Sequence, residues 1–475
     1  MKGIKRKKNC FFVMLLCFCC NIYAQPSRLF RHELSESISH TSTCWIDDET
    51  YITSASHHGS MISRISIVNE ERVCREVVLN DIFVSDLTID NDTLFFCGRG
   101  GNSIRGIIGY ANIEELFYGS GTYTLYDDFI SNPNVVISEF DKLVSYISSS
   151  GQRHIVCIAD NLYMVDFIPQ STQYYNFLTA SLQGFTLTES FQDIVYLPGN
   201  IIIASMDYTY NQPTKLVLRV FDSDNPITPS MNTVKHVFAQ ISDRNILHKR
   251  CVLAAIPSLD MVALMCHTDK QPIGNEQFEV YQSFISLSLF NPWALWDTTH
   301  VNSYAMLSTI ECEQDNYQQQ LLPLHLNWND ATQELIAING LDFFSMSSPE
   351  LLWNFRGNNL FTIPFSHFIN GGTVDNFSLE GTLFQRASFN PSGLRFVTHG
   401  PHATGSAEFF TAKYFTGNLP LSSHCLFSES MYFNTKPTSS TSSTVQKLAT
   451  SGGRTKGSAR QADFFDSQME PECEE

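Results

Sequence analysis

A short hairpin unit recurs along this chain: an apolar strand, a polar turn of two to four residues, and a second apolar strand. In one copy, the strand Asp86–Ile89 is followed by the turn Asp90–Asp92 and the strand Leu94–Cys97. The intervals between copies average about 57 residues, which leaves room for a second hairpin in each. Four strands per unit, repeated seven times, predict a β-propeller. The seven copies begin at Thr43, Asp86, Ile155, Asp193, Val252, His325 and Arg386.

The rest of the pattern also favours an all-β chain. Helical periodicity is confined to Ala111–Tyr118 and Ser348–Phe355, and short runs rich in Val, Ile, Tyr, Phe and Thr fill most of the remainder. A stack of separate β-sandwiches is the alternative, and it predicts a linker about every 100 residues. No linker is evident before residue 436. We therefore expect one propeller over residues 25–435, with seven four-stranded antiparallel blades.

The last copy of the unit carries a family resemblance. Ala387–Phe396 resembles the F-S-P-D-G-x-x-[IL] blade motif of WD-like propellers, such as the periplasmic domain of Tol-type translocation proteins, although Ser392 replaces the usual Asp. The stretch Asp86–Tyr110 is similar to blades of exported bacterial propeller proteins. The resemblance covers two of the seven units well, so it implies an architecture and carries no activity.

The N-terminus reads as a secretory signal over residues 1–24. Five basic residues precede the apolar run Phe11–Cys20, and Ala24-Gln25 is the expected cleavage point. The run is too short for a membrane-spanning helix, and no later segment reaches that length. A retained hydrophobic anchor and a lipid-modified Cys19 or Cys20 are the alternatives. We expect an exported protein that is periplasmic, exposed at the cell surface or secreted.

Charge and cysteine content narrow the partners and the compartment. The full chain has a net charge of −18, and removing the signal makes it more acidic, which disfavours nucleic acid and anionic lipid as partners. Nine cysteines follow residue 24, widely spaced and without C-x-x-C, which excludes a dense disulfide framework and a zinc site. Most lie in apolar strand-like runs, where a cysteine packs as a small hydrophobe. One or two disulfides remain compatible with this spacing, and the sequence alone does not pair them.

The segment 436–475 differs in composition from the rest of the chain. It is rich in Ser, Thr and Gly and poor in apolar residues. Such a composition buries too little apolar surface to offset the entropy of folding. We expect a disordered Ser/Thr-rich tail.

Four polar residues form the candidate binding site. Residues that open the innermost strand of each blade line one mouth of a propeller's central channel. The repeat places Asp86, Asp193, His325 and Arg386 at such positions. The two aspartates could form the carboxylate pair of a glycoside hydrolase. They could equally be structural, each accepting hydrogen bonds from backbone amides of a neighbouring blade.

Other polar motifs are better explained as turns and loops. His57-His58 are adjacent and so point to opposite faces of a strand. The glycines at 98, 100 and 101 do not open a helix, as a phosphate-binding loop would require. Asp90–Asp92 and Asp222–Asn225 lack the Gly and distal Glu of a helical calcium loop. No G-x-S-x-G or H-E-x-x-H occurs. We expect no cofactor, no metal site and no catalytic motif.

Two functions remain open from sequence. The first is an exported propeller that acts as a non-catalytic binding or interaction module for a protein or glycan. The second is a carbohydrate-active propeller enzyme that uses inner-strand carboxylates. The absence of a catalytic motif and the mixed chemistry of the expected channel mouth favour the first.

Overall fold

The computed structural model describes residues 29–473 with internal gaps. The signal segment expected over residues 1–24 therefore lies outside the described residues. The internal segments left out are 35–38, 58–60, 70–71, 101–104, 128–136, 160–162, 170–172, 179–188, 208–214, 225–232, 241–245, 271–281, 291–305, 315–320, 342–358, 367–371, 379–385, 402–406, 414–426, 436–438, 446–447, 452–454, 459 and 462–469.

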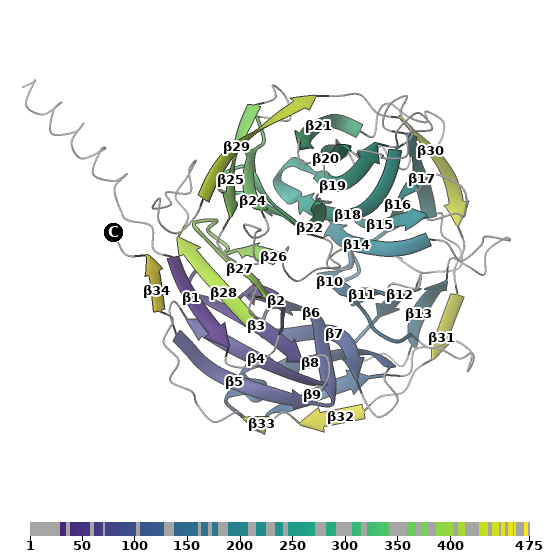
Figure 1. Ribbon diagram of the computed structural model, residues 1–475. Coiled ribbons are helices and arrows are strands. Elements are labelled where there is room, and N and C mark those ends of the chain that lie inside the picture. Colours follow the sequence, from purple (N-terminus) through teal and green to yellow (C-terminus); the bar gives the residue numbers. More distant parts are fainter. Residues whose placement is uncertain are drawn as a thin grey trace, which may run out of the picture.

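Seven four-stranded antiparallel blades form a ring in the part of the chain that the structure describes (Figure 1). Within blades 1 to 6 the strands follow chain order from the axis outward, whereas blade 7 takes its outermost strand from the N-terminal end of the chain. Blade 1 consists of β2 (Ser39–Trp45), β3 (Thr50–His57), β4 (Ile62–Asn69) and β5 (Arg72–Asn80). Blade 2 consists of β6 (Ile82–Asp90), β7 (Thr93–Gly100), β8 (Arg105–Asn112) and β9 (Thr122–Tyr126). Blade 3 consists of β10 (Lys142–Ile147), β11 (Arg153–Ala159), β12 (Tyr163–Phe167) and β13 (Gln173–Leu178).

The remaining blades repeat this plan. Blade 4 consists of β14 (Glu189–Leu197), β15 (Asn200–Asp207), β16 (Lys215–Asp222) and β17 (Thr233–Gln240). Blade 5 consists of β18 (Ile246–Ile256), β19 (Met261–Lys270), β20 (Gln282–Phe290) and β21 (Met306–Gln314). Blade 6 consists of β22 (Leu321–Asn329), β23 (Glu334–Leu341), β24 (Asn359–Pro364) and β25 (Gly372–Ser378). Blade 7 consists of β26 (Arg386–Phe389), β27 (Arg395–Pro401), β28 (Ala407–Lys413) and β1 (Leu29–Leu34).

The ring closes in two ways. The innermost strands β2, β6, β10, β14, β18, β22 and β26 each contact the next around the axis, and β26 contacts β2. Blade 7 also joins the first strand of the ring to the last, because β1 pairs antiparallel with β28 from Leu29↔Ala412 to Leu34↔Ala407. The β-propeller predicted from the repeat is therefore the observed fold.

One repeat unit was assigned wrongly from the sequence. Six of the seven units coincide with the two innermost strands of a blade, but the unit opening at Ile155 is β11 and β12, the second and third strands of blade 3. The innermost strand of that blade is β10, whose partly polar sequence Lys142–Ile147 is less apolar than β11. The more hydrophobic hairpin was therefore mistaken for the inner one.

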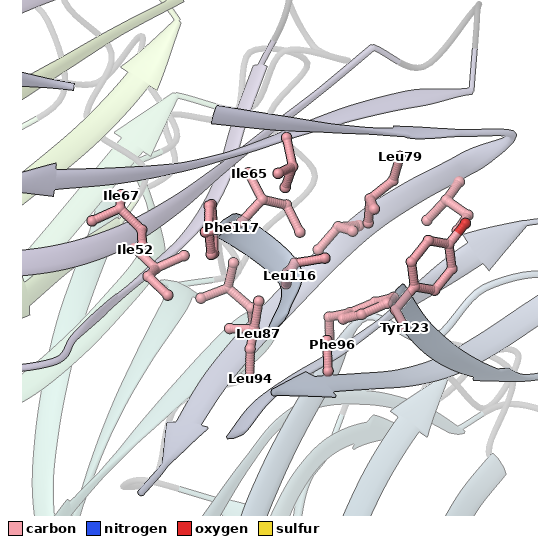
Figure 2. Close-up of a cluster of buried hydrophobic side chains, with 14 of the residues drawn as sticks. Ile52, Ile65, Ile67, Leu79, Leu87, Leu94, Phe96, Leu116, Phe117 and Tyr123 are labelled. Atoms are coloured by element: carbon pink, nitrogen blue, oxygen red, sulfur yellow. The ribbon is translucent and has the colours of Figure 1, made fainter. Parts of the chain in front are cut away.

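The core lies between neighbouring blades. Figure 2 shows the cluster between blades 1 and 2, where Ile52 and Ile65 of blade 1 meet Leu94 and Phe96 of blade 2. All four side chains are fully buried. Equivalent clusters fill the spaces between blades 2 and 3, 3 and 4, 4 and 5, and 5 and 6. Each blade lies between two others, so apolar side chains on both faces of its sheet are buried.

The helical segments are short. The helix α2 (Ile113–Phe117) lies within the expected segment Ala111–Tyr118, is capped by the Asn112 side chain, and buries Leu116 and Phe117. A 3-10 turn, η2 (Pro257–Leu259), joins β18 to β19. The other expected helix, Ser348–Phe355, lies outside the described residues. Among the residues that are described, no helix is both long enough and apolar enough to cross a membrane.

The C-terminal segment pairs with the outer edges of the blades. The strand β29 (Phe427–Thr435) bridges β21 and β25, which joins blades 5 and 6 into one sheet. Further strands then add to blades 4, 3, 2, 1 and 7 in that order, as Figure 1 shows. They are β30 (Ser439–Val445), β31 (Leu448–Ser451), β32 (Thr455–Ser458), β33 (Arg460–Gln461) and β34 (Glu470–Cys473).

This arrangement differs from the disordered tail expected over residues 436–475. The outermost strand of a blade presents unpaired backbone N–H and C=O groups, and any extended segment can pair with them whatever its side chains. Amino-acid composition indicates how much apolar surface a segment can bury, but it does not predict pairing through backbone groups.

Candidate functional site

Five charged or titratable side chains from five different blades meet at the axis. We call them the rim residues: Asp86, Lys142, Asp193, His325 and Arg386. A β-bulge directly precedes Asp86, Asp193 and His325 on their innermost strands. Bulges re-aim the side chain that follows them, which accounts for how these strands turn a polar residue toward the axis.

Asp86 connects four blades. Its Oδ1 accepts hydrogen bonds from the Ser42 hydroxyl of blade 1 (2.6 Å) and from the amide of Leu87 (3.1 Å). The same oxygen pairs with Nη1 of Arg386 on blade 7 (2.6 Å), and Oδ2 accepts from the amide of Leu143 on blade 3 (3.1 Å). Asp86 is only 9% exposed.

The pKa of Asp86 follows from these contacts. Burial acts to raise it, but the positive charges of Arg386 and Lys142 and the hydrogen bonds from Ser42 and Leu143 outweigh burial. The pKa of Asp86 is therefore lowered. This carboxyl remains ionised throughout the neutral range.

Asp193 makes the same kind of connection around the next blades. Its Oδ1 accepts from the amide of Ile194 (3.0 Å) and pairs with Nζ of Lys142 on blade 3 (3.3 Å). Its Oδ2 accepts from the amide of Leu253 on blade 5 (2.9 Å). Asp193 is 5% exposed. Both aspartates therefore bond their own strand and the amide of a neighbouring blade.

His325 joins blade 6 to blade 7. Its Nε2 lies 2.6 Å from the carbonyl oxygen of Ala387, so the ring donates a proton there. Asn327, two residues on, donates to the same carbonyl (3.0 Å) and accepts from the amide of Trp328 (2.8 Å). Burial, together with the positive charges of Lys142 and Arg386, lowers the pKa of His325 to about 3. The imidazole is neutral at neutral pH.

The structure brings all four residues expected from sequence to the axis. The structure pairs Asp86 with Arg386, and Asp193 with Lys142. Lys142 was not expected at the rim, because the innermost strand of blade 3 was placed one strand too late in the sequence. Ser42 rather than Thr43 reaches the rim in blade 1, and Asn327 bonds in blade 6 as the aspartates do in theirs. The strand–turn–strand pattern around the Ser148–Gly151 turn is the signal that could have located β10 and Lys142.

The other polar motifs lie away from the rim. Asp90 pairs with Arg153, and Asn91 adopts a left-handed turn conformation with φ 53°. Asp224 accepts from the amide and hydroxyl of Ser149, which ties a blade 3 turn to blade 4. Gly98 and Gly100 lie on β7. Among the described residues, no three His, Cys, Asp or Glu side chains converge to hold a metal ion. His58 and Asn225 lie outside them.

Each rim carboxylate is paired with a cation: Asp86 with Arg386, and Asp193 with Lys142. A glycoside hydrolase needs one carboxyl group that still carries a proton near neutral pH. The lowered pKa of Asp86 does not fit that role. Both oxygens of Asp193 accept hydrogen bonds from backbone amides, and Oδ1 also pairs with the Lys142 ammonium. The contacts favour a structural role for both, holding neighbouring blades together.

Comparison with known proteins adds little to this picture. No family model matches the chain, and no curated protein matches it in sequence. Among solved structures, one described as YCF48 bound to D1 peptide is similar over 84% of this chain and 98% of its own, with 7% sequence identity and a TM-score of 0.41. At that level the likeness carries no argument about function.

Proposed function

We propose that this chain is an exported β-propeller whose axial rim binds a protein or glycan without chemically converting it. The observation that carries the proposal is the state of the rim carboxylates. Asp86 and Asp193 are nearly buried and bonded to backbone amides of neighbouring blades. They serve the scaffold and leave the rim cations as the groups that meet a ligand.

The exposed part of the rim is rich in hydrogen-bond donors. Counting side-chain surface alone, Arg386 and Lys142 are 20% and 19% exposed, against 12% and 7% for the side chains of their partners Asp86 and Asp193. Guanidinium and ammonium groups donate to carbonyl, carboxylate and hydroxyl oxygens. Peptides and glycans both present such oxygens, which is why these two ligand classes are proposed.

The carbohydrate-active alternative receives less support. It requires Asp86 and Asp193 to act as an acid and a nucleophile or base. Lys142 of blade 3 contacts Asp193, and Arg386 contacts Asp86, so each carboxylate already has a cationic partner. Nothing in these contacts raises the pKa of Asp86 toward that of a general acid.

Binding measurements with matched variants test the proposal. The purified protein is screened against a glycan array and a displayed peptide library, alongside Lys142→Gln, Arg386→Gln and the control Arg75→Gln. Arg75 is exposed on the outer strand β5, over the ring of Tyr118. We expect the rim variants to weaken binding about tenfold, the loss of about 1.4 kcal/mol. Equal binding by all variants would contradict the proposal. Release of sugar from aryl glycosides, lost in Asp193→Asn, would favour the enzyme.

The export part of the proposal rests on residues 1–24. Their order of basic, apolar and small residues matches a cleavable signal. N-terminal sequencing of protein recovered outside the cytoplasm is expected to begin at Gln25 or nearby. Intact Met1 in membrane-embedded material would show a retained anchor instead.

A further inference from the structure

Four buried cysteines of the described chain lie in two pairs. Cys251 and Cys266 face each other on β18 and β19 of blade 5, and each is 1% exposed. Cys97 on β7 and Cys157 on β11 belong to neighbouring blades, and both are fully buried. All four are present as thiols in the structure. No role in the rim uses any of them.

The pair in blade 5 is set by strand register. Cys251 and Cys266 are direct partners in the antiparallel ladder of β18 and β19. Both belong to the core between blades 4 and 5, so both side chains point to the same face. Opposed residues on one face have Cβ atoms about 4.5–5.5 Å apart, and a disulfide needs about 3.5–4.5 Å. A small local movement therefore suffices to join the two sulfur atoms.

The second pair is set by packing between blades 2 and 3. The Cys97 thiol donates to the carbonyl of Phe140 (3.6 Å), and the amide of Phe140 donates to the carbonyl of Gly98 (3.1 Å). Cys157 is the register partner of Leu143, three residues after Phe140. Both cysteines belong to the same core cluster, and the Cys157 thiol is close enough to raise the pKa of Cys97.

We propose that these two pairs are modification sites, closing into the disulfides Cys97–Cys157 and Cys251–Cys266 while the chain folds in an oxidising compartment. In each pair two S–H bonds break and one S–S bond forms, with release of two protons and two electrons. The electron acceptor is a disulfide, either of a small thiol such as glutathione or of a thiol–disulfide oxidoreductase, which is reduced to two thiols. The cellular part of this inference rests on the proposed export.

Burial determines when the reaction takes place. Thiolate is the reacting form, and burial, followed by contact with Cys157, raises the pKa of the Cys97 thiol. An external disulfide also cannot reach a fully buried sulfur atom. Oxidation therefore precedes the final packing of the blades, and the native core then protects the bonds from reduction.

A peptide map of refolded protein tests the pairing. The protein is unfolded with reductant, refolded in a glutathione redox buffer, alkylated, and digested without reduction. We expect the peptides of Cys97 and Cys157 to be linked, and those of Cys251 and Cys266 to be linked. Cys44, whose register partner is Ile52, is the internal control and is expected to be alkylated. Cys157→Ala and Cys266→Ala should each remove only their own link.

The outcomes separate this inference from the proposed function. Alkylation of all four cysteines in protein with a native near-ultraviolet circular dichroism spectrum would overturn the pairing. Links between other partners, such as Cys97 with Cys251, would overturn it as well. If refolding fails, the same map on protein exported by a host decides. Because the refolding map does not depend on export or on ligand binding, failure of either would leave the pairing result intact.

Discussion

The buried carboxylate of Asp86 contacts groups from four of the seven blades. Its two oxygens accept from a hydroxyl, two amides and a guanidinium contributed by blades 1, 2, 3 and 7. Removing one partner of such a network strands a buried polar group, at a cost of about 1–3 kcal/mol. The rim is therefore a structural feature, in which each carboxylate is held by a cation and by a backbone amide of a neighbouring blade.

His325 gives a prediction for acid sensitivity. Its pKa is about 3 in the folded protein, against about 6.5 in an unfolded chain. Between these values the unfolded chain binds a proton that the folded protein does not, so stability falls as pH drops from about 6.5 toward 3. His325→Gln keeps an N–H donor for the Ala387 carbonyl but does not titrate.

Thermal melts at several pH values check this prediction. The fall in Tm between about pH 7 and about pH 5 is expected to be smaller in His325→Gln than in the wild type. That range lies above the titration of Asp86, whose lowered pKa makes its contribution disappear only under stronger acid. Parallel pH profiles for the two proteins would contradict the assignment.

Residue-level roles were predictable only in part. The sequence placed Asp86, Asp193, His325 and Arg386 at the axis because each opens or follows the start of an innermost strand. It could not pair them, since Asp86 and Arg386 lie 300 residues apart and meet only once the ring has closed. Lys142 was missed because its strand is more polar than the one that follows it.

At the scale of the strand and turn, the hairpin of blade 7 shows why its motif has a glycine. Gly393 has φ +69° in the turn between β26 and β27, and its carbonyl accepts a hydrogen bond from the side-chain Nδ2 of Asn329 on blade 6 (2.7 Å). An added Cβ would lie 2.0 Å from Oδ1 of Asn329. The glycine of the motif thus serves both the turn and the contact between blades.

Gly393→Ala and Gly151→Ala together separate these two effects. Gly151 has φ +79° in the corresponding turn of blade 3, but an added Cβ there meets no atom within 4 Å. Both substitutions are expected to cost about 1–2 kcal/mol for the left-handed backbone. Gly393→Ala should lower the Tm further, because Asn329 must also move. Equal losses in the two variants would show that the contact between blades is unimportant.

Closure by β1 leads to a second prediction at this scale. A variant lacking residues 29–34 leaves blade 7 with three strands and exposes the edge of β28. A variant ending after residue 435 removes β30–β34 and leaves every blade with four strands. We expect the first deletion to lower the Tm much more than the second, as measured by circular dichroism. The opposite order would mean that the C-terminal strands, and not β1, hold the ring together.

At the scale of the whole molecule, the architecture was predictable because its signal is repeated. Six hairpins in the sequence report the inner half of six blades, and an error in blade 3 does not change the count. The C-terminal segment was not predictable, since its strands pair through backbone groups that every residue carries.

Limited proteolysis tests the unity of the ring. We expect cleavage to start after about Lys436, because the strands beyond it pair only with outer blade edges, and to leave one resistant core reaching from β1 to β29. Two or three stable fragments of about 100–150 residues would indicate separate domains.

We infer that the rim carboxylates hold the blades together and do not form a catalytic pair. Thermal melts of Asp86→Asn and Asp193→Asn test it most directly, with Asp92→Asn, at an exposed turn position, as the control. Each rim variant is expected to lose about 1–3 kcal/mol of stability and melt at a clearly lower temperature, because a buried amide loses its acceptor. The control should change by less than about 0.5 kcal/mol. Unchanged melting temperatures for both rim variants would contradict the claim and return the two aspartates to the candidate active site.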